Sequence, residues 1–280
     1  MTGRILHISD LHLGHTTTPE PLDGLRELIP GLDPEILVVT GDLTHRGRPA
    51  ELERARELLE SLGPPLVAVP GNHDIPYVFP TRFTRTREAW ERVFGTAQPV
   101  YTSDRLAIVG MNSVRPWRQQ GGAIETSQLD RLAPKLEGAP AGALRAVVLH
   151  HHLAAPPWRA ARKRPVRHRD LVLQRLAFAG VELVLSGHVH QSAVAERREF
   201  EVVERDQRSS IVLATAAGFG RPRPDRRGEA LGFNFYDFDA RSISVVTWSW
   251  SGGTFAEVGR RTFQRSQRDA GTRPITVRSR

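Results

Sequence analysis

Short apolar runs alternate with amphipathic segments along the first two thirds of the chain. Runs at residues 4–9, 35–40 and 66–70 predict strands, because each is brief, apolar and followed by polar or Gly residues. Between the last two, residues 49–62 repeat apolar side chains at helical spacing, with Pro49 at the start and Gly63 after the end. This order of strand, helix and strand favours parallel pairing through a right-handed crossover.

The pattern continues and then changes. Further helices are expected at residues 87–94, 127–136 and 170–179, with strands at 106–111, 146–149 and 181–185. After His190 only strands are expected, at residues 193–196, 211–214, 233–238 and 243–250. From residue 265 onward the chain is polar, rich in Arg and without a core pattern.

Polar residues of a narrow range of types follow five of the predicted strands. The segments are Asp10-Leu11-His12, Gly41-Asp42, Gly71-Asn72-His73-Asp74, His150-His151-His152 and Gly187-His188-Val189-His190. The carboxyl ends of parallel strands meet at one edge of a sheet, where open α/β folds bind ligands. A carboxylate can bridge two cations and imidazole suits transition metals, so the simplest account is a dinuclear metal site. The His-x-His spacing suggests an extended segment, in which alternate residues point the same way.

Composition narrows the chemistry further. The chain has no Cys, which excludes disulfides, thiolate metal sites and cysteine nucleophiles. The first residues do not resemble a signal peptide, and no apolar run reaches the roughly 18 residues of a membrane helix, so a cytoplasmic protein without a membrane partner is expected. The net charge is +8, but the arginines are scattered, and a nucleic-acid partner is therefore not expected.

The five polar segments, in this order and at this spacing, resemble the calcineurin-like metallophosphoesterase superfamily over residues 4–190. The opening Ile8-Ser9-Asp10-Leu11-His12-Leu13-Gly14 looks like that of class III cyclic-nucleotide phosphodiesterases. The resemblance implies one α/β domain over residues 1–262, a four-layer α/β/β/α sandwich of two mixed sheets, and a basic tail over residues 263–280. The oligomeric state stays open, and the late strands are candidates either for an interface between copies or for a wall of the site.

The resemblance also implies roles for individual residues. One metal would be held by Asp10, His12 and His190, the other by Asn72, His150 and His188, with Asp42 bridging them. His73 and Asn72 would contact the substrate, with His73 as a catalytic residue that Asp74 orients. His150 is assigned as the ligand because it directly follows its strand, and His151 is the alternative.

The implied reaction is hydrolysis of a small phosphodiester, with 3′,5′-cyclic AMP as the leading physiological substrate. Two divalent or trivalent ions, drawn from Mn, Fe, Zn and Co, would lie about 3.5–4 Å apart and share the attacking hydroxide. Phosphomonoesters, phosphonate esters and DNA are alternative substrates of such a site. A non-catalytic scaffold is the alternative from another class, although the sequence retains every expected ligand.

Several other residues have two interpretations. His7 lies inside the first predicted strand and is expected to be a packed histidine rather than a ligand. His15 and His45 follow two of the polar segments, so they are either ordinary loop residues or substrate contacts. The basic stretch at residues 159–169 is either a lid that attracts phosphate or a solvated loop.

Overall fold

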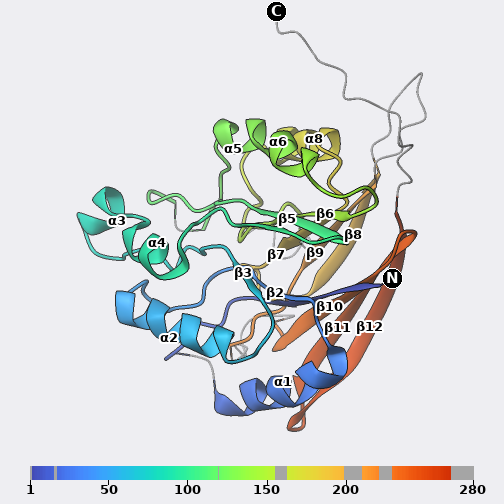
Figure 1. Ribbon diagram of the computed structural model, residues 1–280. Coiled ribbons are helices and arrows are strands. Elements are labelled where there is room, and N and C mark those ends of the chain that lie inside the picture. The colour runs from blue at the N-terminus through green and yellow to red at the C-terminus, as the bar shows by residue number, and fades with distance from the viewer. Residues whose placement is uncertain are drawn as a thin grey trace, which may run out of the picture.

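Two six-stranded sheets form the centre of the protein, and helices cover the outer face of each (Figure 1). The computed structural model describes residues 2–15, 18–118, 120–154, 163–198, 210–220 and 229–265. Both sheets mix parallel and antiparallel pairs. The expected α/β/β/α sandwich is therefore confirmed.

The first sheet has the order β12-β11-β10-β1-β2-β3. Its strands are β1 (Gly3–Ile8), β2 (Ile36–Val39), β3 (Leu66–Ala68), β10 (Gly232–Phe238), β11 (Ser242–Ser251) and β12 (Thr254–Gln264). β1, β2 and β3 are parallel, and the three late strands are joined to β1 as an antiparallel ribbon. The carboxyl ends of β1, β2 and β3 therefore lie along one edge.

The second sheet has the order β4-β5-β6-β7-β9-β8. Its strands are β4 (Val100–Thr102), β5 (Leu106–Gly110), β6 (Leu144–Val148), β7 (Leu183–Ser186), β8 (Ala193–Arg198) and β9 (Ser210–Thr215). β5, β6, β7 and β9 are parallel, while β4 and β8 close the two edges as antiparallel strands.

Helices pack against the two outer faces. They are α1 (Pro19–Leu32), α2 (Pro49–Glu60), α3 (Thr81–Thr84), α4 (Glu88–Phe94), α5 (Thr126–Asp130), α6 (Leu132–Glu137) and α8 (Arg169–Phe178). Figure 1 shows α1 and α2 on one side of the sandwich and α5, α6 and α8 on the other. In α2 most of the helical face expected from the sequence is buried, and the Glu51 carboxylate accepts a hydrogen bond from the Arg48 amide over 3.3 Å at the start of the helix.

Side-chain alternation divides the core into three apolar layers. Ile5 and Ile36 point between the sheets, where they pack with residues of the second sheet such as Val148. Their neighbours Leu6 and Leu37 point the other way, against α1 and α2. A third layer lies between the second sheet and α5, α6 and α8. Because successive strand residues face opposite sides, each sheet can serve two layers at once.

The structure differs from the sequence expectations at several elements. The helix expected at residues 127–136 is two short helices, α5 and α6. The helix α1 and the strands β4 and β12 were not expected. The domain boundary expected after residue 262 falls inside β12, where Phe263 is buried, and residues 266–280 of the expected tail lie outside the described residues.

Within the described part of the chain, no helix combines the length and the apolar character needed to cross a bilayer.

Candidate metal centre

The loops that leave β1, β2 and β3 meet those that leave β6 and β7 at one edge of the sandwich. Parallel pairing within each sheet brings the strand ends together, and packing of the sheets brings the two sets face to face. The predicted ligands all lie in these loops, as listed by strand: Asp10 and His12 after β1, Asp42 after β2, Asn72 after β3, His150 after β6, and His188 and His190 after β7.

One group of side chains contains Asp10, His12, Asp42 and His190. Each offers a ligand atom, and these atoms lie within 4.8 Å of one another. Nε2 of His190 is 3.1 Å from Oδ1 of Asp10 and 3.4 Å from Nε2 of His12. The residues expected to hold the first metal are therefore brought together.

The second group is built around His150. Its Nε2 lies 3.1 Å from Oδ1 of Asn72 and 3.1 Å from Nδ1 of His188. All three side chains are buried. The residues expected to hold the second metal therefore also converge.

Asp42 lies between the two groups and faces both. Its Oδ1 is 3.5 Å from Nε2 of His150, while its Oδ2 is 3.9 Å from Nε2 of His12. A carboxylate with one oxygen on each side is suited to bridging two cations.

The donor set fits a pair of transition-metal ions. Among the described residues, Oδ1 of Asp10 is buried, and Nε2 of His190, at 3.1 Å, is the polar atom that faces it. The Nε2 atoms of His12 and His190 lie so close together that two lone pairs would repel each other unless a cation or proton lay between them. Imidazole, carboxylate and amide oxygen together suit Mn, Fe, Zn or Co rather than Ca²⁺, which takes oxygen ligands.

Electrostatics keeps these groups in the protonation states that bind metals. Burial lowers the pKa of His12 to about 4 and that of His188 well below the usual range. Burial would raise the pKa of Asp10, but the charge and hydrogen bond of His190 outweigh it and hold that pKa well below its usual range. The neutral imidazoles of His12 and His188 and the ionised carboxylate of Asp10 are forms that coordinate a cation.

Neighbouring groups fix the orientation of the ligands. Nδ1 of His150 donates to the carbonyl of Thr40 over 2.7 Å, which leaves the lone pair of Nε2 facing the cluster. Oδ2 of Asp10 accepts hydrogen bonds from Ser9 Oγ at 2.6 Å and from the His188 amide at 2.9 Å. These bonds use Oδ2 and leave Oδ1 of Asp10 facing His190.

The backbone at the ligands is left-handed. The φ angles are 52° at Asp10, 48° at His12, 53° at Asp42, 71° at His188 and 54° at His190. The prediction that the His-x-His segment is extended is therefore wrong, because both histidines lie in a tight turn. Such conformations cost of order 1–3 kcal/mol each and concentrate at functional sites.

Glycines allow the loops to approach one another. A Cβ on Gly71 would overlap the Asp42 backbone and carboxylate, and one on Gly187 would overlap Ser9 and lie 2.8 Å from Oδ2 of Asp10. Glycine at these two positions is therefore a condition of the close packing around the carboxylates.

His73 lies at the margin of the cluster. Its amide donates to Oδ1 of Asp42 over 2.8 Å, and its ring meets that of His12 edge-on, with centroids 4.8 Å apart. Nδ1 lies 3.0 Å from the carbonyl of His45 and 3.0 Å from Oη of Tyr77. These contacts occupy Nδ1 and leave Nε2 as the nitrogen available to a substrate.

Asp74 has a different role from the one expected. Its Oδ1 accepts hydrogen bonds from the amide and hydroxyl of Thr44, and its Oδ2 accepts one from the amide of Gly71. Burial and the charge of Asp42 raise the pKa of Asp74 to about 6. The carboxylate therefore ties the loops after β2 and β3 together, and the groups that orient the His73 ring are His45 and Tyr77.

The alternative ligand His151 also lies in the cluster. His150, His151 and His188 each offer a nitrogen within 4.8 Å of the others. Nδ1 of His151 is 2.9 Å from Oγ of Ser113, and its Nε2 is buried without a hydrogen bond. His150 is closer to Asn72 and Asp42, which is why the geometry favours it as the ligand.

The other histidines are distributed as follows. His7 is a packed histidine, hydrogen-bonded to Tyr236 and Thr40 at 3.0 Å each. His15 and His45 stack with centroids 4.0 Å apart, and His45 lies 6.0 Å from His73. The basic stretch at residues 159–169 lies partly outside the described residues, and its Lys163 is buried and donates to the carbonyl of His188.

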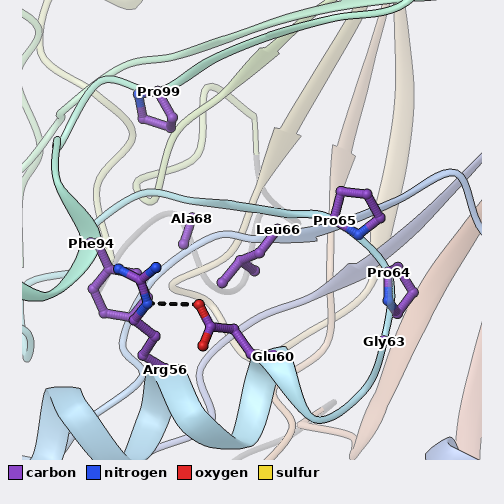
Figure 2. Close-up of a pocket in the computed structure, with 9 residues that line it drawn as sticks. All are labelled: Arg56, Glu60, Gly63, Pro64, Pro65, Leu66, Ala68, Phe94 and Pro99. Atoms are coloured by element: carbon purple, nitrogen blue, oxygen red, sulfur yellow. Dashed lines mark hydrogen bonds and ion pairs between the residues drawn. The ribbon is translucent and has the colours of Figure 1, made fainter.

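A separate hollow of about 380 Å³ lies where α2 leads into β3. Figure 2 shows the paired side chains of Arg56 and Glu60 rising from α2 on one side of it, with Pro99 on the opposite side. Arg56 pairs with Glu60 at 2.7 Å and also donates to the carbonyl of Val93. This hollow opens at the start of β3, whereas the metal ligands follow its end.

Comparison with known proteins agrees with this geometry. The family model for calcineurin-like phosphoesterases matches residues 3–192, so the chain belongs to that family. A probable cyclic nucleotide phosphodiesterase from Synechococcus sp. is 32% identical over 215 residues, which cover 70% of this chain and 77% of that protein.

Solved structures share the fold at low identity. The purple acid phosphatase PPD1 of yellow lupin (Lupinus luteus) superposes with a TM-score of 0.68 at 14% identity, over 95% of this chain and 54% of that one, so this chain spans about half of the lupin enzyme. GAP50, the anchor in the inner membrane complex of Plasmodium, gives a TM-score of 0.61 at 14% identity over 95% of this chain and 90% of that chain.

Proposed function

We propose that this protein is a phosphodiesterase that uses two transition-metal ions, with 3′,5′-cyclic AMP as the first physiological substrate to test. The observation that carries the proposal is Asp42, whose two carboxylate oxygens face two separate groups of ligands. The name of the Synechococcus relative supports a cyclic nucleotide. The family's phosphoesterase chemistry is consistent with the neutral imidazoles and ionised carboxylates of the cluster.

Seven residues would bind the two metal ions, and His73 would transfer a proton. Asp10, His12 and His190 would hold one ion, Asn72, His150 and His188 the other, and Asp42 both. When bound, such a pair of ions acidifies water and offsets the charge of a phosphate.

His73 is the residue that would protonate the leaving oxygen. Nδ1 is held by His45 and Tyr77, so Nε2 can donate a proton to the alcohol oxygen as it departs from phosphorus. The Asp42 contact to the His73 amide fixes the ring beside the ligands. Water attacks phosphorus and the bond to the alcohol breaks.

A panel assay on one metal-reconstituted sample tests the proposal. Bis(4-nitrophenyl) phosphate, 4-nitrophenyl phosphate and cyclic AMP are compared, and the diesters are expected to be hydrolysed faster than the monoester. Asp42→Ala should lose both bound metal and activity, whereas Asp104→Ala, at an exposed turn, should keep both. Full activity in a metal-free Asp42→Ala sample, or a preference for the monoester, would contradict the proposal.

A further inference from the structure

A second hollow, of about 310 Å³, is lined in part by Tyr77, which contacts His73. Its lining comes from the loop before α2 and from the segment that contains α3 and α4. Tyr77 is part of the lining, and its Oη is 3.0 Å from Nδ1 of His73. Tyr77 therefore connects the hollow to the Nδ1 side of the His73 ring.

Arginine is the most frequent charged residue of the lining. It contains Arg46, Arg48, Arg85 and Arg92, and Glu88 is its acidic residue. Glu88 pairs with Arg92 at 3.2 Å and with Arg85 at 3.6 Å, so one carboxylate is shared by two guanidinium groups. Within the described residues, the guanidinium of Arg46 has no ion pair or hydrogen bond, so the hollow offers positive charge that the protein itself does not neutralise.

The remaining wall is apolar, and hydrogen bonds hold the loop that forms it. Tyr77 and Val78 contribute its surface. The Arg82 guanidinium lies 5.6 Å from the centroid of the Tyr77 ring and donates to the carbonyls of Pro76 at 3.0 Å and Pro116 at 2.7 Å. These bonds hold the loop that carries Tyr77. An apolar wall next to arginines suits an organic group that bears an anion.

We propose that this hollow binds a phosphate carried by the departing alcohol, so that the preferred substrate is a phosphodiester with a second phosphate on its leaving group. The inference rests on the proposed function. If His73 protonates the leaving oxygen, the rest of the alcohol lies next to His73 and can extend past Tyr77 into the hollow.

The chemistry of the arginines favours phosphate over a neutral group. A phosphomonoester carries about −1.5 to −2 charge at pH 7, and the planar guanidinium binds its oxygens in pairs. The volume lies at the lower end of the roughly 300–1,000 Å³ usual for small-molecule sites. Cyclic AMP has a single phosphate, which the metals would bind, so it would leave the arginines without an anion.

Two dinucleotides that differ by one phosphate test the inference. Thymidylyl-thymidine (TpT) yields thymidine and thymidine 5′-monophosphate, whereas its 5′-phosphorylated form (pTpT) yields two molecules of the monophosphate. In both, water adds to phosphorus, the bond to the 3′ oxygen breaks and that oxygen takes up a proton. We expect kcat/KM to be about tenfold higher for pTpT, in line with the gain from one charge-assisted contact.

Variants of Arg46 test whether the hollow binds the second phosphate. Arg46 is exposed, so its substitution is not expected to disturb folding. Arg46→Ala should bring the pTpT/TpT ratio close to one, and Arg46→Glu should bring it below one. Arg54→Ala and Arg54→Glu make the same charge changes on an exposed part of α2 outside the hollow and should keep the wild-type ratio.

Bis(4-nitrophenyl) phosphate, measured in parallel, separates the two claims. If the wild-type enzyme hydrolyses this ester but has the same kcat/KM for pTpT and TpT, the inference is overturned and the proposed function stands. The same conclusion follows if the pTpT/TpT ratio of kcat/KM is high and remains high in Arg46→Glu. If no diester is hydrolysed, the proposed function fails, and calorimetric binding of uncleaved pTpT and TpT decides the inference. Tighter binding of pTpT that Arg46→Glu abolishes supports it, and equal binding overturns it.

Discussion

At the scale of single residues, the two nitrogens of His73 have different surroundings. Nδ1 is occupied by the carbonyl of His45 and the hydroxyl of Tyr77, whereas Nε2 is left for a substrate. The His73 ring also meets the His12 ring edge-on, and the His73 amide donates to Asp42. The amide contact is made by the backbone, so it is retained when the His73 side chain is replaced.

Replacement of His73 should reduce kcat and leave metal content unchanged. His73→Gln is expected to lower kcat by about 10²–10⁴-fold for a poor leaving group such as thymidine, because such a group needs a proton. The loss should be smaller for 4-nitrophenolate, which departs readily without one. Kinetics with both esters, beside metal analysis, test this; an equal loss for both would contradict proton donation.

A second residue-scale prediction concerns His7. Burial lowers its pKa to about 3, although the charge of Asp10 acts in the opposite direction. The unfolded chain has a histidine pKa of about 6.5, so below that pH only the unfolded state gains the proton. The contribution of His7 to stability is complete above about pH 6.5 and is lost as pH falls towards 3, by at most about 1.4 kcal/mol per pH unit.

Urea unfolding of metal-free protein between pH 7.5 and 5 measures this effect. His7→Gln should flatten the dependence of the unfolding free energy on pH, because no titrating group remains at this buried position. His168→Gln replaces an exposed histidine and should keep the wild-type slope. Parallel slopes for the His7 variant and the wild type would argue against the shift.

The residues also show what a sequence can predict about such a site. Asp10, Asp42 and His188 could be predicted because each directly follows, or nearly follows, an apolar strand. Their left-handed backbone could not, since Asp and His adopt it only where surrounding packing imposes it. The contact of Tyr77 with His73 was missed too, because it depends on the turn between them and has no sequence pattern.

At the scale of elements, the predictions failed where local signals conflicted with packing. α1 contains Gly24, Gly31 and Pro30, which argue against a helix, yet Leu22 and Leu25 bury against the first sheet. β12 is mostly exposed, and its sequence lacks a regular alternation of apolar and polar residues. It forms a strand because it pairs with β11. The buried strands and α2 were predicted well because their apolar pattern and their packing agree.

The loop between β7 and β8 provides an element-scale prediction. Gly187→Ala would place a methyl group against Ser9 and Asp10, so we expect destabilisation of about 1–3 kcal/mol and weaker metal binding. Gly31→Ala is the matched control: a Cβ there meets nothing within 4 Å, and in helix α1 it should stabilise by up to about 1 kcal/mol. Chemical unfolding with metal titration measures both, and similar effects of the two substitutions would refute the packing argument.

At the scale of the whole molecule, the proposed ligands come from both sheets. Asp10, Asp42 and Asn72 follow strands of the first sheet, and His150 and His188 follow strands of the second. Ions bound between them would link the two halves of the sandwich in addition to the apolar layer that joins them. Binding to the native state alone stabilises that state by mass action.

Metal removal should therefore lower the melting temperature of the entire domain. With Mn²⁺ at about 100 times its Kd, stabilisation is about 2.7 kcal/mol, which corresponds to an increase in Tm of roughly 5–10 °C. Calorimetry with Mn²⁺ and with EDTA measures the difference. Asp42→Ala should show no increase and Asp104→Ala the full one; an unchanged wild-type Tm would mean that no ion is held between the sheets.

The basic hollow and the metal ligands occupy different parts of the architecture. Arg46 and Arg85 belong to connecting segments outside both sheets, whereas Asp10 and His188 are anchored directly to strands. If the hollow binds the leaving group as proposed, substitutions in these exposed connections would change which ester is preferred while the strand-anchored side chains stay in place. Substrate preference could then be altered independently of the proposed metal centre.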